Sequence, residues 1–121
     1  MGSTVRAIVV TADLDRLLAF YGGLLGAVEV ERVPAEGPPF YVGLRIGDSD
    51  LGFVSDPSAP AGPGRILLSI AVPDVDALLE RVSALGGQVP GVPNDMPWGQ
   101  RVAHVQDPDG TPVNLTQDLP A

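Results

Sequence analysis

The 121-residue sequence contains no cysteine and no lysine, and it has one histidine and one tryptophan. Without cysteine, the chain can form neither a disulfide scaffold, nor a thiolate zinc site, nor a cysteine nucleophile. No apolar run approaches the ~20 residues that span a bilayer. The N-terminal residues do not have the pattern of a secretory leader. We therefore expect a cytoplasmic protein that does not enter a membrane.

Basic residues are scarce, since seven arginines face 15 acidic residues and give a net charge of -8. Nucleic acids and anionic membranes both attract basic surfaces, so we expect neither as a partner. An acidic surface attracts a cationic ligand over long range, although it can also serve solubility alone. Hydrophobic residues make up 45% of the chain, which is typical of a globular protein of one-domain length.

The two halves of the chain repeat one pattern. The segment 11–18 (TADLDRLL) resembles the segment 72–79 (VPDVDALL), 61 residues later. In each segment an Asp stands where a helix N-cap belongs, and apolar residues follow at i, i+3, i+4 and i+7 from the first one. Gly26 and the pair 86–87 are stop signals. The pattern predicts one amphipathic helix in each half, capped by Asp13 and Asp74.

Short apolar stretches separated by turn residues surround each predicted helix. The predicted strands are 5–11, 27–33, 40–46, 51–55, 66–72, 88–92, 100–106 and 112–117. The segment 107–110 (DPDG) has the residue order of a type I turn. We therefore predict an α+β fold in a single domain. It would consist of two tandem βαβββ modules, 1–55 and 65–121, joined by a linker rich in Pro and Gly at 56–64.

This repeat, the segment 13–21 and the segment 97–110 resemble the vicinal oxygen chelate superfamily of glyoxalases, bleomycin-resistance proteins and extradiol dioxygenases. The resemblance covers nearly the whole chain. It implies that each module is a curved mixed sheet with a helix on its back. It also implies that two modules pair, within one chain or across a dimer, to form a cup that holds a ligand. We therefore expect a homodimer.

The metalloenzymes of this superfamily usually carry His, Gln or Glu at fixed positions of the cup. The resemblance places Arg6, Leu67 and Asn114 at three of these positions, and the fourth, near Phe53 or Val54, is apolar. Arginine does not ligate a divalent cation, leucine has no donor atom, and asparagine is a weak neutral ligand. We therefore expect no metal, no other cofactor and no catalytic residue, and we favour a protein that is not an enzyme.

This pattern resembles the antibiotic-binding branch of the superfamily. The resemblance implies a metal-free protein that sequesters an antibiotic or related natural product, with an aromatic or cationic group, in a cup at the dimer interface. The alternative is a metal-dependent glyoxalase-like lyase or isomerase, or a ring-cleaving dioxygenase. A third reading is a domain that senses a small molecule.

Several side chains are candidates for ligand contact, and each has a structural alternative. Trp98 lies in a loop rich in Pro and Gly, where it could stack on a ligand or pack on its own core. His104 could bind a ligand or serve as a structural hydrogen-bonding residue. Arg6 could hold an acidic or carbonyl group or pair with a nearby acid. The full set of candidates is Trp98, His104, Phe40, Phe53, Arg6, Asn114, Met96, Gln100, Asn94 and Leu67.

Overall fold

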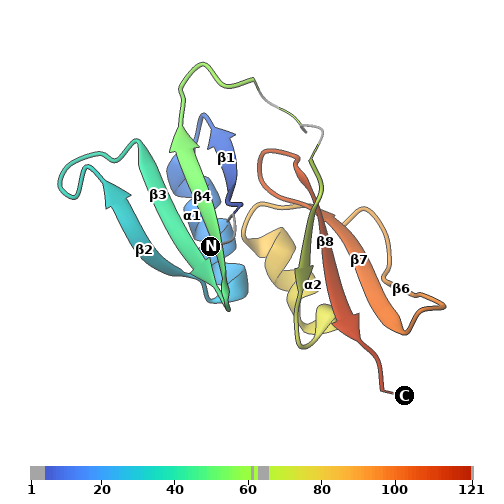
Figure 1. Cartoon of the computed structure of the whole chain (residues 1–121). Coiled ribbons are helices and arrows are strands. Elements are labelled where there is room, and N and C mark those ends of the chain that lie inside the picture. The colour runs from blue at the N-terminus through green and yellow to red at the C-terminus, as the bar shows by residue number, and fades with distance from the viewer. Residues whose placement is uncertain (1–4, 61, 63–65, 121) are drawn as a thin grey trace. The chain divides into compact units, whose positions relative to one another are not determined.

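The computed structural model describes residues 5–60, 62 and 66–120. The chain divides into two compact units, 1–61 and 62–121, each with one helix and one four-stranded sheet (Figure 1). The division falls within the segment 56–64, of which residues 61 and 63–65 lie outside the described residues. We call these units the first and the second module. Their secondary structure confirms the predicted α+β fold of tandem βαβββ modules.

The elements of the first module are β1 (Ala7–Thr11), α1 (Leu14–Leu25), β2 (Val28–Val33), β3 (Tyr41–Ile46) and β4 (Ser49–Ser55). Those of the second are β5 (Leu68–Ala71), α2 (Val75–Ala84), β6 (Asn94–Asp95), β7 (Gln100–Gln106) and β8 (Pro112–Asp118). The strand orders are β1-β4-β3-β2 and β5-β8-β7-β6. In each sheet the first strand runs parallel to the last, and the other pairs are antiparallel, so both sheets are mixed as predicted.

Both helices begin at the predicted aspartates. The Asp13 carboxylate accepts the backbone N–H of Arg16 at 3.1 Å, and the Asp74 carboxylate accepts that of Ala77 at 3.3 Å. α1 ends at Gly26, whose φ of 64° is the left-handed conformation that glycine adopts at little cost. The capping residues that the repeat identified therefore set the helix boundaries.

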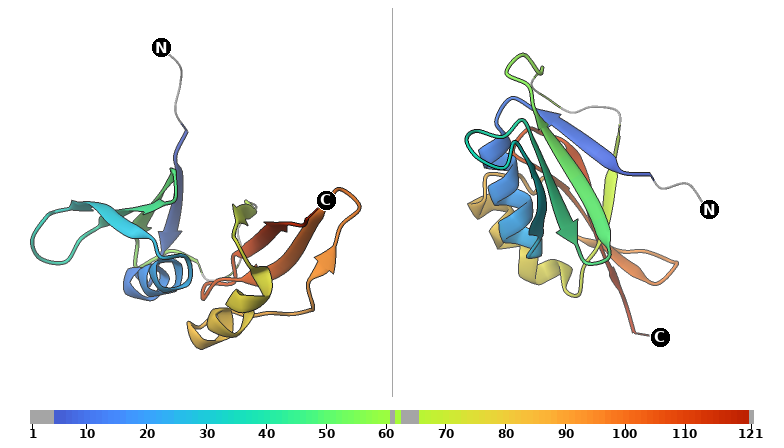
Figure 2. Two further views of the ribbon diagram at one scale, coloured as in Figure 1. Left: turned by 90° about the horizontal axis from the view of Figure 1, so that it is seen from below. Right: turned by 60° about the vertical axis from the view of Figure 1, so that its left-hand side comes forward.

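Each helix covers one face of its own sheet, as the two views of Figure 2 show. In the first module, Leu17, Phe20 and Tyr21 of α1 are buried together with Val42 and Phe53 of the sheet. In the second, the buried residues are Val75 and Val82 of α2 and Ala103, Val105, Val113 and Leu115 of the sheet. The opposite face of each sheet lacks a helix of its own module, and we call it the open face.

One predicted strand is wrong. The segment 88–92 forms no strand apart from an isolated bridge between Gln88 and Gln106, and the edge strand is the two-residue β6. Pro90 and Pro93 carry no backbone N–H to donate, so this stretch cannot sustain a ladder. The other predicted strands agree with the observed ones to within about two residues, as is usual for element ends. No helix of the described residues is long and apolar enough to cross a membrane.

Candidate ligand-binding faces

The strand register shows which residues share the open face of the first module. Ile8 of β1 lies beside Gly52 of β4, and Gly52 is paired with Gly43 of β3. Because side chains alternate along a strand, positions two residues away point the same way. The open face therefore also carries Arg6, Val10, Tyr41, Arg45, Asp50 and Val54.

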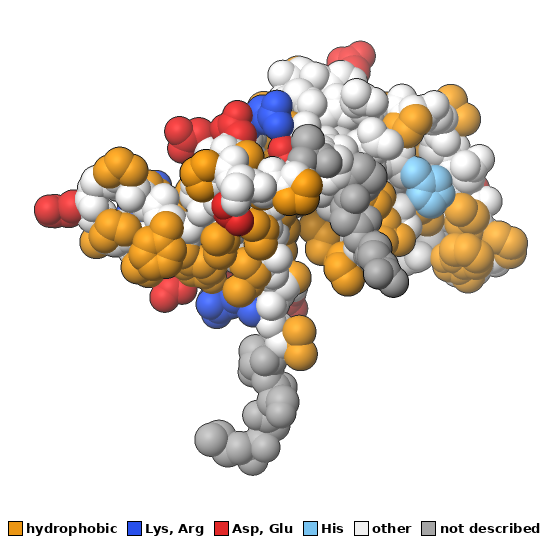
Figure 3. All heavy atoms as spheres, turned by 90° about the horizontal axis from the view of Figure 1, so that it is seen from above, with side chains coloured by type: hydrophobic (Ala, Val, Ile, Leu, Met, Phe, Trp, Pro, Cys, Tyr) orange, Lys and Arg blue, Asp and Glu red, His pale blue; other side chains and the backbone are white. Residues whose placement is uncertain are grey.

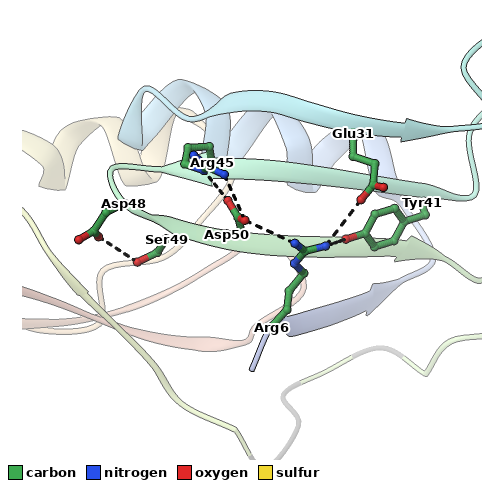
Figure 4. Close-up of polar contacts among 7 residues, drawn as sticks. All are labelled: Arg6, Glu31, Tyr41, Arg45, Asp48, Ser49 and Asp50. Atoms are coloured by element: carbon green, nitrogen blue, oxygen red, sulfur yellow. Dashed lines mark hydrogen bonds and ion pairs between the residues drawn. The ribbon is translucent and has the colours of Figure 1, made fainter. Parts of the chain in front are cut away.

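Arg6 lies at the centre of a polar network on this face (Figure 4). Its Nη1 donates to the Tyr41 hydroxyl at 3.3 Å and lies 3.6 Å from Glu31 Oε1. Its Nη2 donates to Asp50 Oδ2 at 3.4 Å. Arg45 binds the same carboxylate more closely, with Nε 2.6 Å from Asp50 Oδ1. Of the two alternatives for Arg6, the structure shows pairing with nearby acids, and both acids belong to its own module.

The charges of this network balance, since two guanidinium groups face two carboxylates. The hydrogen bond to Tyr41, and then Asp50 and Glu31, raise the pKa of Arg6. The hydrogen bond from Arg45, with a smaller contribution from Arg6, holds the pKa of Asp50 below its ordinary value. Both arginines and Asp50 are therefore charged at neutral pH, and the formal charges of the two arginines, Asp50 and Glu31 sum to zero.

The two candidate phenylalanines of this module have different surroundings. Phe53 is completely buried, with its ring 5.4 Å from that of Tyr21, so it belongs to the core under α1 and not to the open face. Its paired position explains this, because Phe53 faces Val42, which is also buried. Phe40 precedes β3 and is 57% exposed, so it lies outside the core in which Val42 is buried.

The open face of the second module carries hydrogen-bonding side chains without formal charge at its centre. His104 of β7 is paired with Asn114 of β8, and His104 Nδ1 lies 2.7 Å from Asn114 Oδ1. Ser69 of β5 lies beside Asn114. His104 is exposed, and the histidine is visible at the surface in Figure 3. Leu67 precedes β5 and is exposed, and because it lies two residues before Ser69, alternation places it on this face.

Trp98 lies in the tight turn between β6 and β7 and is 68% exposed. Its Nε1 donates to Gln100 Oε1 at 3.0 Å, and Gln100 Nε2 donates to Asp118 Oδ1 at 3.1 Å. The indole is therefore held by its polar edge and is not packed into a core. Met96 closes the turn through backbone hydrogen bonds, and Asn94 lies in β6, exposed and paired with Val102.

An arginine on the helix side anchors this turn. Arg101 Nε donates to Asp95 Oδ1 of β6 at 2.7 Å, and its Nη1 donates to Asp76 Oδ2 of α2 at 2.8 Å. Its guanidinium lowers the pKa of Asp95. The β6–β7 hairpin, which carries Trp98, is thus joined to the helix of its own module.

The residues at the family's metal positions do not fit a resident divalent ion. The Arg6 guanidinium is a cation that pairs with carboxylates, and Leu67 has no donor atom. The amide oxygen of Asn114 already forms a hydrogen bond with His104. The register places Gly52, and not Phe53 or Val54, at the first-module position equivalent to Asn114, and glycine also lacks a donor. In the part of the chain that the structure describes, no three His, Asp or Glu side chains gather where they could hold a metal.

Sequence reasoning missed Tyr41, Glu31, Arg45 and Asp50 on the first open face. From sequence alone, charged residues on short strands are interpreted as solvent-exposed. The sequence of one strand does not show which side chains of the neighbouring strand lie beside it. One signal was available: Gly43 and Gly52 interrupt predicted strands, and glycine inside a strand marks a close approach of another group. Here the approaching group is the Tyr41 side chain.

Comparisons with known proteins identify the family. The family model described as the Glyoxalase/Bleomycin resistance protein/Dioxygenase superfamily matches residues 3–115. "Putative glyoxylase CFP32" of Mycobacterium tuberculosis (strain CDC 1551 / Oshkosh) is 31% identical over 119 residues, which are 98% of this chain and 45% of that protein. The chain therefore spans less than half the length of the curated relatives it matches.

Solved structures share the fold. A glyoxalase/bleomycin resistance protein/dioxygenase family enzyme from Burkholderia phytofirmans PsJN has a TM-score of 0.79 at 24% identity, covering 94% of this chain and 97% of that one. A bleomycin resistance determinant encoded on the transposon Tn5 has a TM-score of 0.69 at 23% identity, covering 97% and 98%. Together with the family match, this shows that the chain belongs to the glyoxalase/bleomycin resistance protein/dioxygenase superfamily.

Proposed function

We propose that this protein is a metal-free binder that sequesters an antibiotic or related natural product without making or breaking a bond in it. One observation carries the proposal. The positions that hold metal ligands in the family's enzymes are here a paired arginine, a leucine and a hydrogen-bonded asparagine. The side chains at these positions can contact a ligand but do not form a set of metal donors.

The open faces support a binding role. The first combines exposed apolar side chains, Ile8 and Val10, with the polar network around Arg6. The second combines the His104–Asn114 pair with the exposed indole of Trp98. Apolar surface with a few oriented polar groups is typical of small-molecule sites. One solved structure with the same fold is named a bleomycin resistance determinant, and resistance to an antibiotic is the type of function proposed here.

The proposal includes a homodimeric, cytoplasmic protein whose ligand carries an aromatic or cationic group and lies in a cup at the dimer interface. It includes neither a nucleic acid nor a membrane as partner. The alternative is a metal-dependent enzyme, and the curated relative's name, which contains the word glyoxylase, favours it. An enzyme of that kind would need a metal held by residues other than those at the family positions.

Native mass spectrometry of the purified protein, with and without metal-free bleomycin, tests the proposal. We expect a dimer without a stoichiometric divalent ion that takes up one compound per protomer and releases it with unchanged mass. Trp98→Ala should weaken binding, and Val92→Ala, which removes an exposed side chain from the same module, should not. A compound recovered in modified form, or one divalent ion per site with activity lost to a chelator, would overturn the proposal.

A further inference from the structure

The Tyr41 ring occupies space that the missing Cβ of Gly52 leaves on the first open face, and it also lies in van der Waals contact with the Cβ position of Gly43. A Cβ built on Gly52 would lie 2.7 Å from the Tyr41 hydroxyl oxygen and 2.9 Å from the ring atom Cε1. A Cβ built on Gly43 would lie 3.5 Å from the same oxygen and 3.7 Å from Cε2 on the other edge of the ring. The ring therefore lies low between β3 and β4, with one edge toward each glycine. Any larger residue at position 52 would displace it.

The hydroxyl of this tyrosine is oriented by Arg6. Figure 4 shows the hydroxyl pointing from β3 toward the guanidinium. The hydroxyl oxygen accepts from Arg6 Nη1 at 3.3 Å, so its own proton can be donated to a further acceptor. Ring position and hydroxyl direction are both set without a ligand, which reduces the ordering that a ligand would have to impose.

Arg6 is the loosely held member of its network. Its three polar contacts measure 3.3, 3.4 and 3.6 Å, whereas Arg45 reaches the shared Asp50 carboxylate at 2.6 Å. Hydrogen bonds at the longer distances are weak. Arg45 already compensates Asp50, and the Glu31 side chain is about half exposed to water, so Arg6 can turn its N–H groups toward a ligand without leaving a buried carboxylate uncompensated.

The surroundings of the ring define the chemistry of the ligand. The side chains of Ile8, Val10 and Val33, which share this face, are all exposed. The nearby charges balance, so the site offers no net attraction to a strongly charged molecule. A flat apolar body can lie on the ring and the aliphatic side chains, and an acceptor at its edge can reach Arg6 and the Tyr41 hydroxyl.

We propose that Tyr41, seated on Gly43 and Gly52 and oriented by Arg6, is the floor of a binding site for an uncharged, flat aromatic molecule that carries a carbonyl oxygen. This inference rests on the proposed function, because it names the chemical class of ligand that the binder takes. It differs from the expectation drawn from the net charge, which favoured a cation. It also assigns a role to a tyrosine that sequence reasoning had passed over.

The test uses two neutral probes of similar shape: coumarin, which carries a carbonyl, and naphthalene, which carries no acceptor. Binding to the full-length protein is measured by NMR titration, with the amide signals of Gly43 and Gly52 as reporters of position. We expect both probes to shift these signals and coumarin to bind more tightly. Tyr41→Leu should weaken both probes by roughly tenfold, the order of one lost stacking contact.

Further variants separate stacking from hydrogen bonding. Tyr41→Phe and Arg6→Leu should retain naphthalene binding and lose the preference for coumarin. Gly52→Ala should weaken both probes, because its Cβ displaces the ring, whereas Gly22→Ala, whose Cβ meets no atom within 4 Å, should bind as the unmodified protein does. Tyr41→Phe keeps the test valid if Tyr41→Leu does not fold, which circular dichroism would show.

Three outcomes would overturn the inference: no shift at Gly43 and Gly52, a folded Tyr41→Leu that binds both probes as tightly as the unmodified protein does, or a Tyr41→Phe that keeps the preference for coumarin. Failure of the proposed function looks different. If a natural product is bound with an affinity that depends on Trp98 but not on Tyr41, the inference is lost and the proposed function remains. If the probes bind at Tyr41 but the protein chemically alters its natural product, the inference remains and the proposed function is lost.

Discussion

The two open faces are built on the same backbone positions and carry different side chains. The central row of each face takes one residue from each of three neighbouring strands: Ile8, Gly52 and Gly43 in the first module, and Ser69, Asn114 and His104 in the second. Two glycines in one module thus correspond to a hydrogen-bonded His–Asn pair in the other. Tyr41 corresponds in the same way to Val102.

This difference shows how a repeated fold produces two different surfaces. The glycines leave room for Tyr41 to lie along the first sheet, and the surface becomes an aromatic ring edged by charges. In the second module, His104 and Asn114 stand at the corresponding positions and are joined by a hydrogen bond. The size of two side chains, and not the backbone, decides which surface forms.

The largest expected effect concerns the turns that join the last two strands of each module. Asp107 is 2% exposed, and its Oδ1 accepts the backbone N–H groups of Asp109 and Thr111 at 2.9 and 3.0 Å. Asp107→Ala should lower the free energy of unfolding by about 2 kcal/mol, because both donors lose their acceptor. Asp48 lies in the equivalent exposed turn of the first module, and Asp48→Ala should cost less than about 0.5 kcal/mol. Urea unfolding measures both, and equal losses would contradict the expected difference.

A glycine substitution tests whether ring packing distinguishes the first face. Gly52→Ala should destabilise the protein by about 1 kcal/mol, because its Cβ would lie 2.7 Å from the Tyr41 hydroxyl and the ring must move. Adding Tyr41→Leu should relieve the clash and recover part of the loss. Gly22→Ala in α1 is the matched control, and it should stabilise the protein by about 0.5–1 kcal/mol. Thermal unfolding of the three variants checks these signs; a neutral Gly52→Ala would show that the ring moves without cost.

Acid should weaken one arginine–carboxylate pair in each module. Hydrogen bonds from Arg45 and Arg101 lower the pKa values of Asp50 and Asp95 below the ordinary 3.8. Depressed pKa values in the folded state stabilise it fully above the ordinary pKa, and this stabilisation is lost as the pH falls through the folded-state value.

The urea midpoint should therefore fall as the pH drops below about 4, and less steeply in Asp50→Asn and Asp95→Asn. Glu36→Gln, in an exposed loop of the first module, is the control for a general change in charge. If one variant flattens the profile and the other leaves it unchanged, the two pairs do not contribute alike.

The smallest expected effect on stability comes from making the first face resemble the second. Arg6→Leu gives the residue before β1 the identity of Leu67, its counterpart in the second repeat. The contacts of Arg6 are exposed and screened by water, so the free energy of unfolding should change little. Thermal unfolding by circular dichroism measures this, with Arg16→Leu on the exposed side of α1 as comparison. A loss of stability clearly larger than that of Arg16→Leu would mean that the network contributes to folding.

Much of the fold could be predicted because its signals are local. The capping aspartates, the helical spacing and the turn at Asp107 each act within a few residues, and the structure has all of them where the sequence placed them. Of the candidate site residues, His104, Asn114, Leu67 and Arg6 share the parity of the open faces. The position of Phe53 on the buried helix side stayed open at the sequence level, because an alternating pattern does not state which face of a sheet the helix covers.

The sequence by itself determined the repeat, the two capped helices, the order of most strands along the chain and the absence of a strong metal donor at Arg6, Leu67 and Asn114. These depend on residue type and on spacing along one strand or helix. The tertiary structure alone decided that Tyr41 lies over Gly52, that Arg6 meets Asp50 and Glu31, and that His104 bonds Asn114. Such contacts join residues on different strands, and only the register between those strands brings their side chains together.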